Sequence, residues 1–165
     1  MESFHEDMMA FKKQLDKGSI QVAYKGLMDF FMSLRFHFQK KYPEFIVPSN
    51  VYFGYMDMTY FSIIPKSFKD KKLKIAIVFN YETFGFEAWL SAVNKNVLTE
   101  YWNLIKDKTW DKYRIVKPGK GIDSILEYNL VKNPDFNNLD GLTKQIEKGT
   151  INFIKDIEGY LCRIK

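Results

Sequence analysis

The sequence predicts an α+β domain with a five-stranded, mainly antiparallel sheet and helices packed on it. Three observations favour this fold class. Apolar residues recur every three or four positions near both ends of the chain, which is typical of amphipathic helices. In the middle of the chain they alternate with polar residues, as in strands, and short connections there favour antiparallel neighbours. No linker or low-complexity segment divides residues 1–165, so we expect one domain.

Two helices are expected before the first strand. Ser3 followed by Glu6 is the pattern of a capping box, and apolar residues then repeat at helical spacing. Gly18 is expected to end this first helix in a left-handed conformation, and Ser19 to cap the second. The second apolar stripe is broad and continues until Pro43 ends the helix.

Three strands are expected next. The segment 51–65 alternates and is rich in aromatic and β-branched residues, which predicts a long first strand. Residues 66–72 are expected to form a basic loop. Apolar residues then alternate over 73–80 and again over 84–90, with a few turn residues between the two runs, which predicts an antiparallel hairpin.

A helix, two strands and a final helix complete the predicted order. Helical spacing returns over 96–107, with Asn96 placed as the cap. Strands are expected over 113–117 and 122–131, on either side of a Pro-Gly-Lys-Gly sequence that suits a tight reversal. Spacings of three and four then predict a last helix over 139–160.

An eight-residue pattern occurs twice, because residues 13–20 read KQLDKGSI and residues 144–151 read KQIEKGTI. Glycine followed by serine or threonine is common where one helix ends and another begins. Good capping at two places would explain the likeness, and so would an internal repeat. The sequence leaves both explanations open, together with the question whether Gly149 breaks the last helix.

Charge and composition narrow the possible functions. The net charge is +5, but the lysines are interleaved with acids along most of the chain, which disfavours a nucleic-acid partner without excluding it. The apolar runs are too short to cross a membrane, and a single cysteine fits a reducing cytoplasm. Aromatic residues make up 17% of the chain, more than a minimal core requires, so some are expected in a groove or an interface.

Four stretches of the chain resemble a known family. They read GYMDMTYFS, KLKIAIVFN, FEAWLSAVNK and LTKQIEKGT, and in this order and spacing they resemble the short bacterial proteins grouped as domain of unknown function 7000. The resemblance covers nearly the whole chain. It implies a bacterial, single-domain, cytoplasmic protein and carries over no catalytic residue. The order of elements after the first helix is also similar to that of bacterial secretion chaperones, an analogy of topology without shared motifs.

Asp57, Glu87 and Lys74 are the candidate groups if the chain is an enzyme or a nucleic-acid-binding domain. A metal-dependent nuclease of the restriction-enzyme type needs acids on successive strands and a lysine two residues after the second acid. Trp89 stands where that lysine would follow Glu87, which removes the group that polarises the water. Solvent exposure or pairing with nearby lysines is therefore the favoured role of both acids.

Asp57 is the first residue of the three to test. Strict alternation would place its side chain on one strand face with Tyr55 and Thr59, whose hydroxyls can donate hydrogen bonds to a carboxylate. We therefore expect Asp57 on a mixed polar face of a central strand, in a structural role. Gly54 is expected to mark a bulge or a close approach of the backbone.

No metal site and no cofactor are expected. The two histidines, His5 and His37, are widely separated, and Cys162 lies in the last helical turn, so no structural ligand spacing is present. The favoured function is a non-catalytic cytoplasmic recognition domain that binds a protein or peptide partner or forms a homodimer. Its candidate binding residues are Tyr55, Trp89, Trp102, Trp110, Tyr113 and Arg114.

Overall fold

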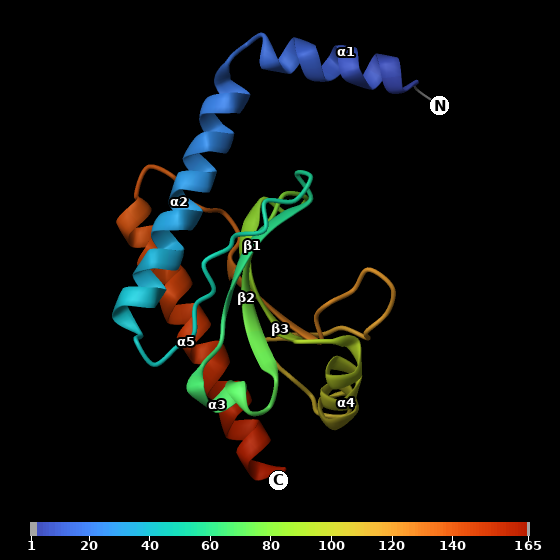
Figure 1. Ribbon diagram of the computed structural model, residues 1–165, viewed down its shortest axis with the longest axis vertical. Helices are drawn as coiled ribbons and strands as arrows, with labels where there is room; N and C mark the ends of the chain where they lie inside the picture. The colour runs from blue at the N-terminus through green and yellow to red at the C-terminus, as the bar shows by residue number, and fades with distance from the viewer. Residues whose placement is uncertain (1–2, 165) are drawn as a thin grey trace.

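The computed structural model describes residues 3–164, which form five helices and one five-stranded antiparallel sheet, as predicted (Figure 1). The α+β fold class is therefore confirmed. The helices are α1 (Phe4–Leu15), α2 (Ser19–Lys41), α3 (Lys66–Lys69), α4 (Lys95–Ile105) and α5 (Leu139–Arg163). The strands are β1 (Met58–Ile63), β2 (Leu73–Asn80), β3 (Gly85–Ala92), β4 (Arg114–Ile115) and β5 (Leu126–Val131).

The sheet has the strand order β1-β2-β3-β5-β4, and each neighbouring pair is antiparallel. The β2–β3 hairpin lies at its centre, with Ile77 opposite Ala88. The register between β3 and β5 shifts between Phe86 and Glu87, which marks a bulge or irregularity. Because the strands alternate, one face of β2 and β3 is apolar and the other carries polar side chains.

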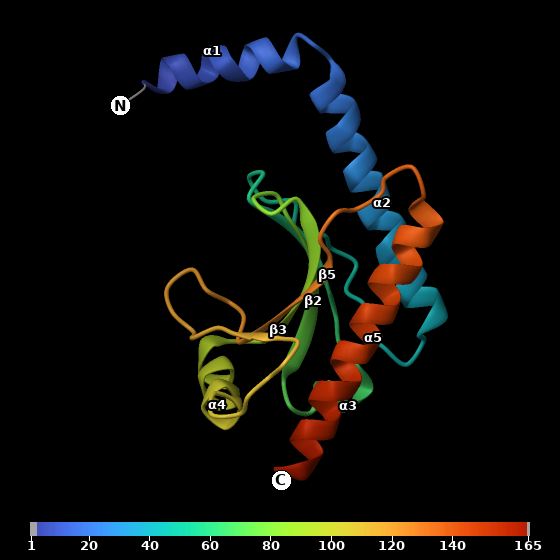
Figure 2. The same ribbon diagram turned by 180° about the vertical axis from the view of Figure 1, so that it is seen from behind.

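The apolar face is covered by α2 and α5, which lie side by side in both views (Figures 1 and 2). The core between them and the sheet is rich in phenylalanine. The Phe31 ring lies edge-on to Phe61 and tilted against Phe86, and all three are buried. Burying a side chain of this size contributes roughly 1.5–3 kcal/mol. The fold is thus held mainly by α2, α5 and the apolar face of the sheet.

At one end, the opposite face of the sheet is covered by α4 and by the loop between β4 and β5 (Figures 1 and 2). We call the uncovered part of this side the open face. It is formed by side chains of the first three strands that point away from α2 and α5. Its strand residues include Met58, Tyr60, Lys74, Ala76, Trp89 and Ser91, and the turns at one end add Asp57 and Glu82.

Helix α1 projects from the beginning of α2, on the same side of the sheet as the open face (Figures 1 and 2). The predicted capping box is present, with Ser3 and Glu6 bonded reciprocally. Gly18, with φ 80°, separates the two helices in the predicted left-handed conformation. None of the α1 side chains is buried.

The first strand was predicted too long. Residues 51–57 form a loop, and its one β-bridge to the sheet joins Tyr52 to Tyr60. Gly54 and Met56 have φ of 73° and 62°, which no strand residue adopts, so regular pairing begins at Met58. Strand β1 is also an edge strand, whereas a central strand was expected.

Other local details also differ from the prediction. The strands expected over 113–117 and 122–131 are shorter, Arg114–Ile115 and Leu126–Val131. The cap of α2 is Gly18 and not Ser19. Lys66–Lys69 form a short helix where a loop was expected, and the side chain of its Phe68 is buried. The cap of α4 is Asn94, whose side chain accepts the backbone N–H of Val97, and not Asn96.

The repeated pattern forms two different structures. In its first copy Gly18 ends a helix, but in its second copy Gly149 lies inside α5, which runs unbroken from Leu139 to Arg163. A Cβ at Gly149 would lie 2.7 Å from Leu130 Cδ2, so this glycine allows α5 to approach β5 closely. The pattern therefore does not mark a second break between helices.

Candidate recognition surface

Two hollows lie along the open face, and they share Met58 and Trp89. The first has a volume of about 230 Å³ and lies between the sheet and the beginning of α4. The second has a volume of about 430 Å³ and lies at the end where Asp57 and Glu82 are found. Trp89, half-buried on β3 opposite Ala76, therefore occupies the middle of the surface.

Glu87 is a buried acid, only 4% exposed, on the same strand as Trp89, so the expected solvent exposure or lysine pairing is wrong for this residue. The Trp89 indole Nε1–H donates to its Oε2 at 2.7 Å, and the Asn80 amide lies 3.5 Å from its Oε1. These bonds hold the carboxylate against the sheet, and Glu87 does not line either hollow. Glu87 thus helps to fix the orientation of the Trp89 ring.

The three candidate catalytic groups do not converge on one hollow. Lys74 lines the first hollow and Asp57 the second. Glu87 lies opposite Val78 of β2, and Lys74 lies four positions away from Val78 on the same strand. Lys74 and Glu87 are therefore separated by about 13 Å along the strand direction. The arrangement does not place an acid and the lysine around one bound molecule.

Asp57 lies in the turn that precedes β1. Its Oδ1 accepts the backbone N–H groups of Tyr55 at 2.9 Å and Met58 at 2.8 Å. These two backbone hydrogen bonds lower the pKa of Asp57. The side chains of Tyr55 and Thr59 were expected to donate to this carboxylate. That prediction is wrong, because the chain turns here and Thr59 donates instead to the Phe53 carbonyl.

Replacing Asp57 by alanine is expected to lower the melting temperature by about 2–4 °C, because two turn hydrogen bonds are lost. Asparagine keeps an oxygen acceptor at the same place, so Asp57→Asn should recover most of the loss. Thermal unfolding followed by circular dichroism measures both variants. An unchanged melting temperature in Asp57→Ala would show that these bonds do not support the turn.

The other candidate binding residues are dispersed. Tyr55 is 91% exposed in the loop before β1. Trp110 and Tyr113 line a separate hollow of about 290 Å³ beside α5. Tyr113 is buried, donates to Asp156 and packs its ring on Phe153.

Trp102 and Arg114 have local partners. Trp102 is half-buried on α4, with the Lys106 ammonium 5.0 Å and the Lys117 ammonium 5.8 Å from its ring centre. Arg114 on β4 pairs with Glu127 on the neighbouring strand. Of the six predicted binding residues, Trp89 is the one that lines the hollows of the open face.

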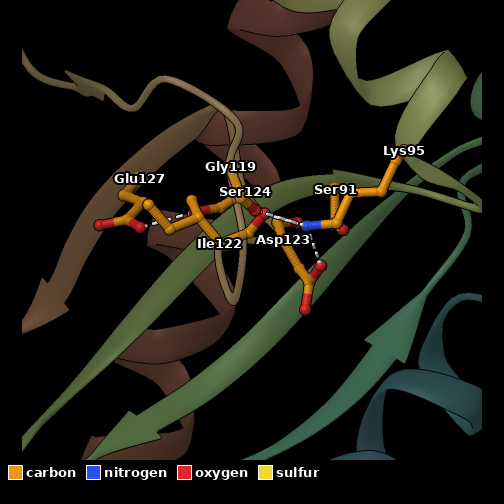
Figure 3. A network of polar contacts seen from close by, with 7 residues as sticks. All are labelled: Ser91, Lys95, Gly119, Ile122, Asp123, Ser124 and Glu127. Carbon is orange, nitrogen blue, oxygen red and sulfur yellow. Dashed lines mark hydrogen bonds and ion pairs between the residues drawn. The ribbon is translucent and has the colours of Figure 1, made fainter.

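Lys95 fixes one rim of the first hollow (Figure 3). It donates to the Gly119 carbonyl at 3.0 Å and to that of Ile122, and pairs with Asp123 at 2.7 Å. The helix dipole disfavours a lysine in the first turn of a helix. The position of Lys95 at the start of α4 is therefore the sequence signal for a role outside the helix. Two further hydrogen bonds hold the loop between β4 and β5. Ser91 on β3 donates to the Asp123 carbonyl, and Ser124 donates to Glu127 on β5.

Glu147 joins the two helices on the other side of the sheet. His37 Nε2, Tyr42 Oη and Lys41 Nζ each lie 2.6 Å from its carboxylate. Burial alone would raise the pKa of Glu147, but the hydrogen bonds from these three groups lower it to about 2. Since His37 and Glu147 are 110 positions apart, no local pattern predicts this cluster.

Helix α1 presents an apolar stripe to solvent. Phe4, Met8 and Phe11 follow one another at spacings of four and three and therefore share one face. Phe4 is 79% exposed, and Met8 and Phe11 are also exposed. The predicted amphipathic pattern is thus correct, but among the described residues this face is not part of the hydrophobic core.

The helices of the described residues do not include one that is long and apolar enough to cross a membrane. Within residues 3–164, no group of three or more His, Cys, Asp or Glu side chains is placed to hold a metal ion. A family model described as "Domain of unknown function (DUF7000)" matches residues 4–161. No curated protein and no solved structure matches the chain.

Proposed function

Because the chain belongs to the family Domain of unknown function (DUF7000), whose description assigns no activity, we propose a function from the molecule's own geometry. In this proposal the chain is a non-catalytic recognition domain. It binds a protein or peptide partner, or a second copy of itself, through α1 and the open face.

The exposed stripe of α1 is the observation that carries this proposal. An isolated helix of 12 residues is marginal in water, even with good capping. Helices of this length owe most of their stability to the packing of an apolar face, and residues 3–164 provide no such packing for the face of α1. A partner that covers Phe4, Met8 and Phe11 would supply it.

The alternative is an enzyme or a nucleic-acid-binding domain that uses Asp57, Glu87 and Lys74. It is less well supported, because Asp57 and Lys74 line different hollows and Glu87 is held by Trp89. Chemistry on a bound molecule requires such groups to meet within hydrogen-bond reach of one another or of the substrate.

Hydrogen exchange tests the proposed role of α1. In a dilute sample that sedimentation shows to be monomeric, the amides of residues 4–15 should exchange with little protection, while those of α5 remain protected. Strong protection of α1 is expected only in the assembled state. If α1 in the monomer is protected as well as α5, then the helix needs no partner and the proposal is wrong.

A further inference from the structure

We propose that the partner of α1 is a second copy of this chain. In the proposed dimer each copy places its α1 on the open face of the other, so that two identical contacts form. This inference rests on the proposed function and specifies the partner. It is argued from surface area, from the side of the molecule on which the two surfaces lie, and from charge.

The molecule exposes more surface than a compact monomer of its size. Its accessible surface is 10452 Å² at a mass of 19.6 kDa. A compact monomer of this mass exposes about 8,600 Å², so the excess is roughly 1,900 Å². Stable homodimers bury on the order of 1,000–2,500 Å² per partner, which is the range of this excess.

Both halves of the contact are present on each copy, and they lie on the same side of the molecule. Figure 2 shows α1 extending over the side of the sheet that carries α4 and the open face. Around a two-fold axis, a helix that contacts a surface of its partner has its own surface contacted in the same way. One chain therefore supplies everything that two reciprocal contacts need.

The charges of α1 and of the open face are complementary, and they fix the direction of binding. Beside the apolar stripe of α1, Asp7 lies in the first turn and Lys12 in the last turn. On the open face Lys74 lies in the first hollow, while Asp57 and Glu82 lie in the second. The first turn of α1 is thus expected over Lys74, and its last turn near the two acids.

The length of α1 matches that of the open face, and both carry apolar groups between their charged ends. Twelve helical residues span about 18 Å, and the strand from Lys74 to Asn80 spans about 20 Å. Met58 and Trp89 lie between the charged ends of the open face, as Met8 lies between the charged ends of α1. Tryptophan and methionine are residue types that contribute strongly at protein interfaces.

Disulfide trapping tests the exchange directly. In a Cys162→Ser background, Met8→Cys and Met58→Cys are made as separate single-cysteine chains, mixed, equilibrated and oxidised. The mixture should give at least about tenfold more disulfide-linked dimer than either chain alone, because α1 faces the open face across the contact. Lys40→Cys on α2, mixed with Met8→Cys, is the control and should give little product.

A charge swap tests the direction of binding. Asp7→Lys and Lys74→Glu should each raise the dissociation constant of the dimer roughly tenfold, because like charges then face each other twice. Mixing the two variants restores opposite charges at both contacts and should bring the constant back to within about threefold of the natural chain. Analytical ultracentrifugation measures all three samples. No recovery in the mixture would refute this direction.

The remaining outcomes separate this inference from the proposed function. Dominant trapping of Met8→Cys with itself would place α1 against α1 and refute the exchange. A chain that stays monomeric at about 200 µM, a concentration at which even a weak dimer forms, would refute the second copy but leave recognition of another protein standing. Protection of α1 in that monomer would refute the proposed function itself.

Discussion

Replacing Glu147 by glutamine is expected to lower the free energy of unfolding at pH 7 by about 2–3 kcal/mol. The carboxylate is buried and accepts hydrogen bonds from His37, Tyr42 and Lys41. Glutamine keeps the size of the side chain but removes the charge and one acceptor oxygen. Urea unfolding followed by tryptophan fluorescence measures the loss.

The same group makes stability depend on acid pH. Its pKa is about 2 in the folded chain and 4.5 in the unfolded reference. Because the folded pKa is the lower one, the stabilisation is fully present above about pH 5 and is lost as the pH falls toward 2. The shift corresponds to at most about 3 kcal/mol. Glu147→Gln should therefore flatten this part of the stability profile.

The control for Glu147 is Glu100→Gln, an exposed acid on α4. It should change the free energy of unfolding by less than about 0.5 kcal/mol and leave the pH profile unchanged. If Glu147→Gln loses as much stability between pH 5 and pH 2 as the natural chain does, then the cluster does not hold this carboxylate ionised.

Replacing Gly54 by alanine is expected to destabilise the chain by about 2–3 kcal/mol. Its φ is 73°, and an added Cβ would lie 2.0 Å from the Met58 carbonyl oxygen and 2.8 Å from Asp57 Oδ1. The first contact is with backbone, so the turn into β1 must shift to relieve it. Loss of the Tyr52–Tyr60 bridge, seen as faster exchange of the Tyr52 and Tyr60 amides, should accompany the loss of stability.

The control for Gly54 has the opposite expected sign. Gly26 lies exposed in α2, and an added Cβ there would meet nothing within 4 Å. Gly26→Ala should therefore stabilise the chain by about 0.5–1 kcal/mol through helix propensity. Equal effects of the two substitutions would mean that the geometry at Gly54 is not what requires glycine.

Local patterns were sufficient for much of the fold. The hairpin at 73–80 and 84–90 was predicted nearly to the residue, since strict alternation and a short turn together leave few other pairings. The first two helices were also predicted well, because a capping box and a left-handed glycine mark their boundaries.

The errors arose where tertiary contacts or backbone conformation decide the structure. Aromatic alternation over 51–65 matched a strand, but positive φ at Gly54 and Met56 ends the pairing at Met58. The likeness of the repeated pattern left open a break at Gly149, but α5 is continuous there, and the close approach of Leu130 on β5 leaves no room for a Cβ at this position. Neither cause is visible in the spacing of apolar residues.

The candidate surface was predicted only in part. Trp89 was expected to bind, and it lies at the centre of the open face. The amphipathic pattern of α1 was also clear, but periodicity gives the direction of an apolar stripe within a helix and not what covers it. Whether a stripe is buried by its own chain depends on where the helix leaves the body, which at α1 is decided by the geometry around Gly18.

The position of α1 outside the core has a consequence for the order of folding and assembly. The buried cluster begins at Phe30 and contains no residue of α1, so the body of the chain can acquire its packing without that helix. Folding of the body is then a first-order process that does not depend on protein concentration. In the proposed dimer, docking of α1 onto a second copy would be a bimolecular step that follows folding, with a rate set by how much folded chain has accumulated.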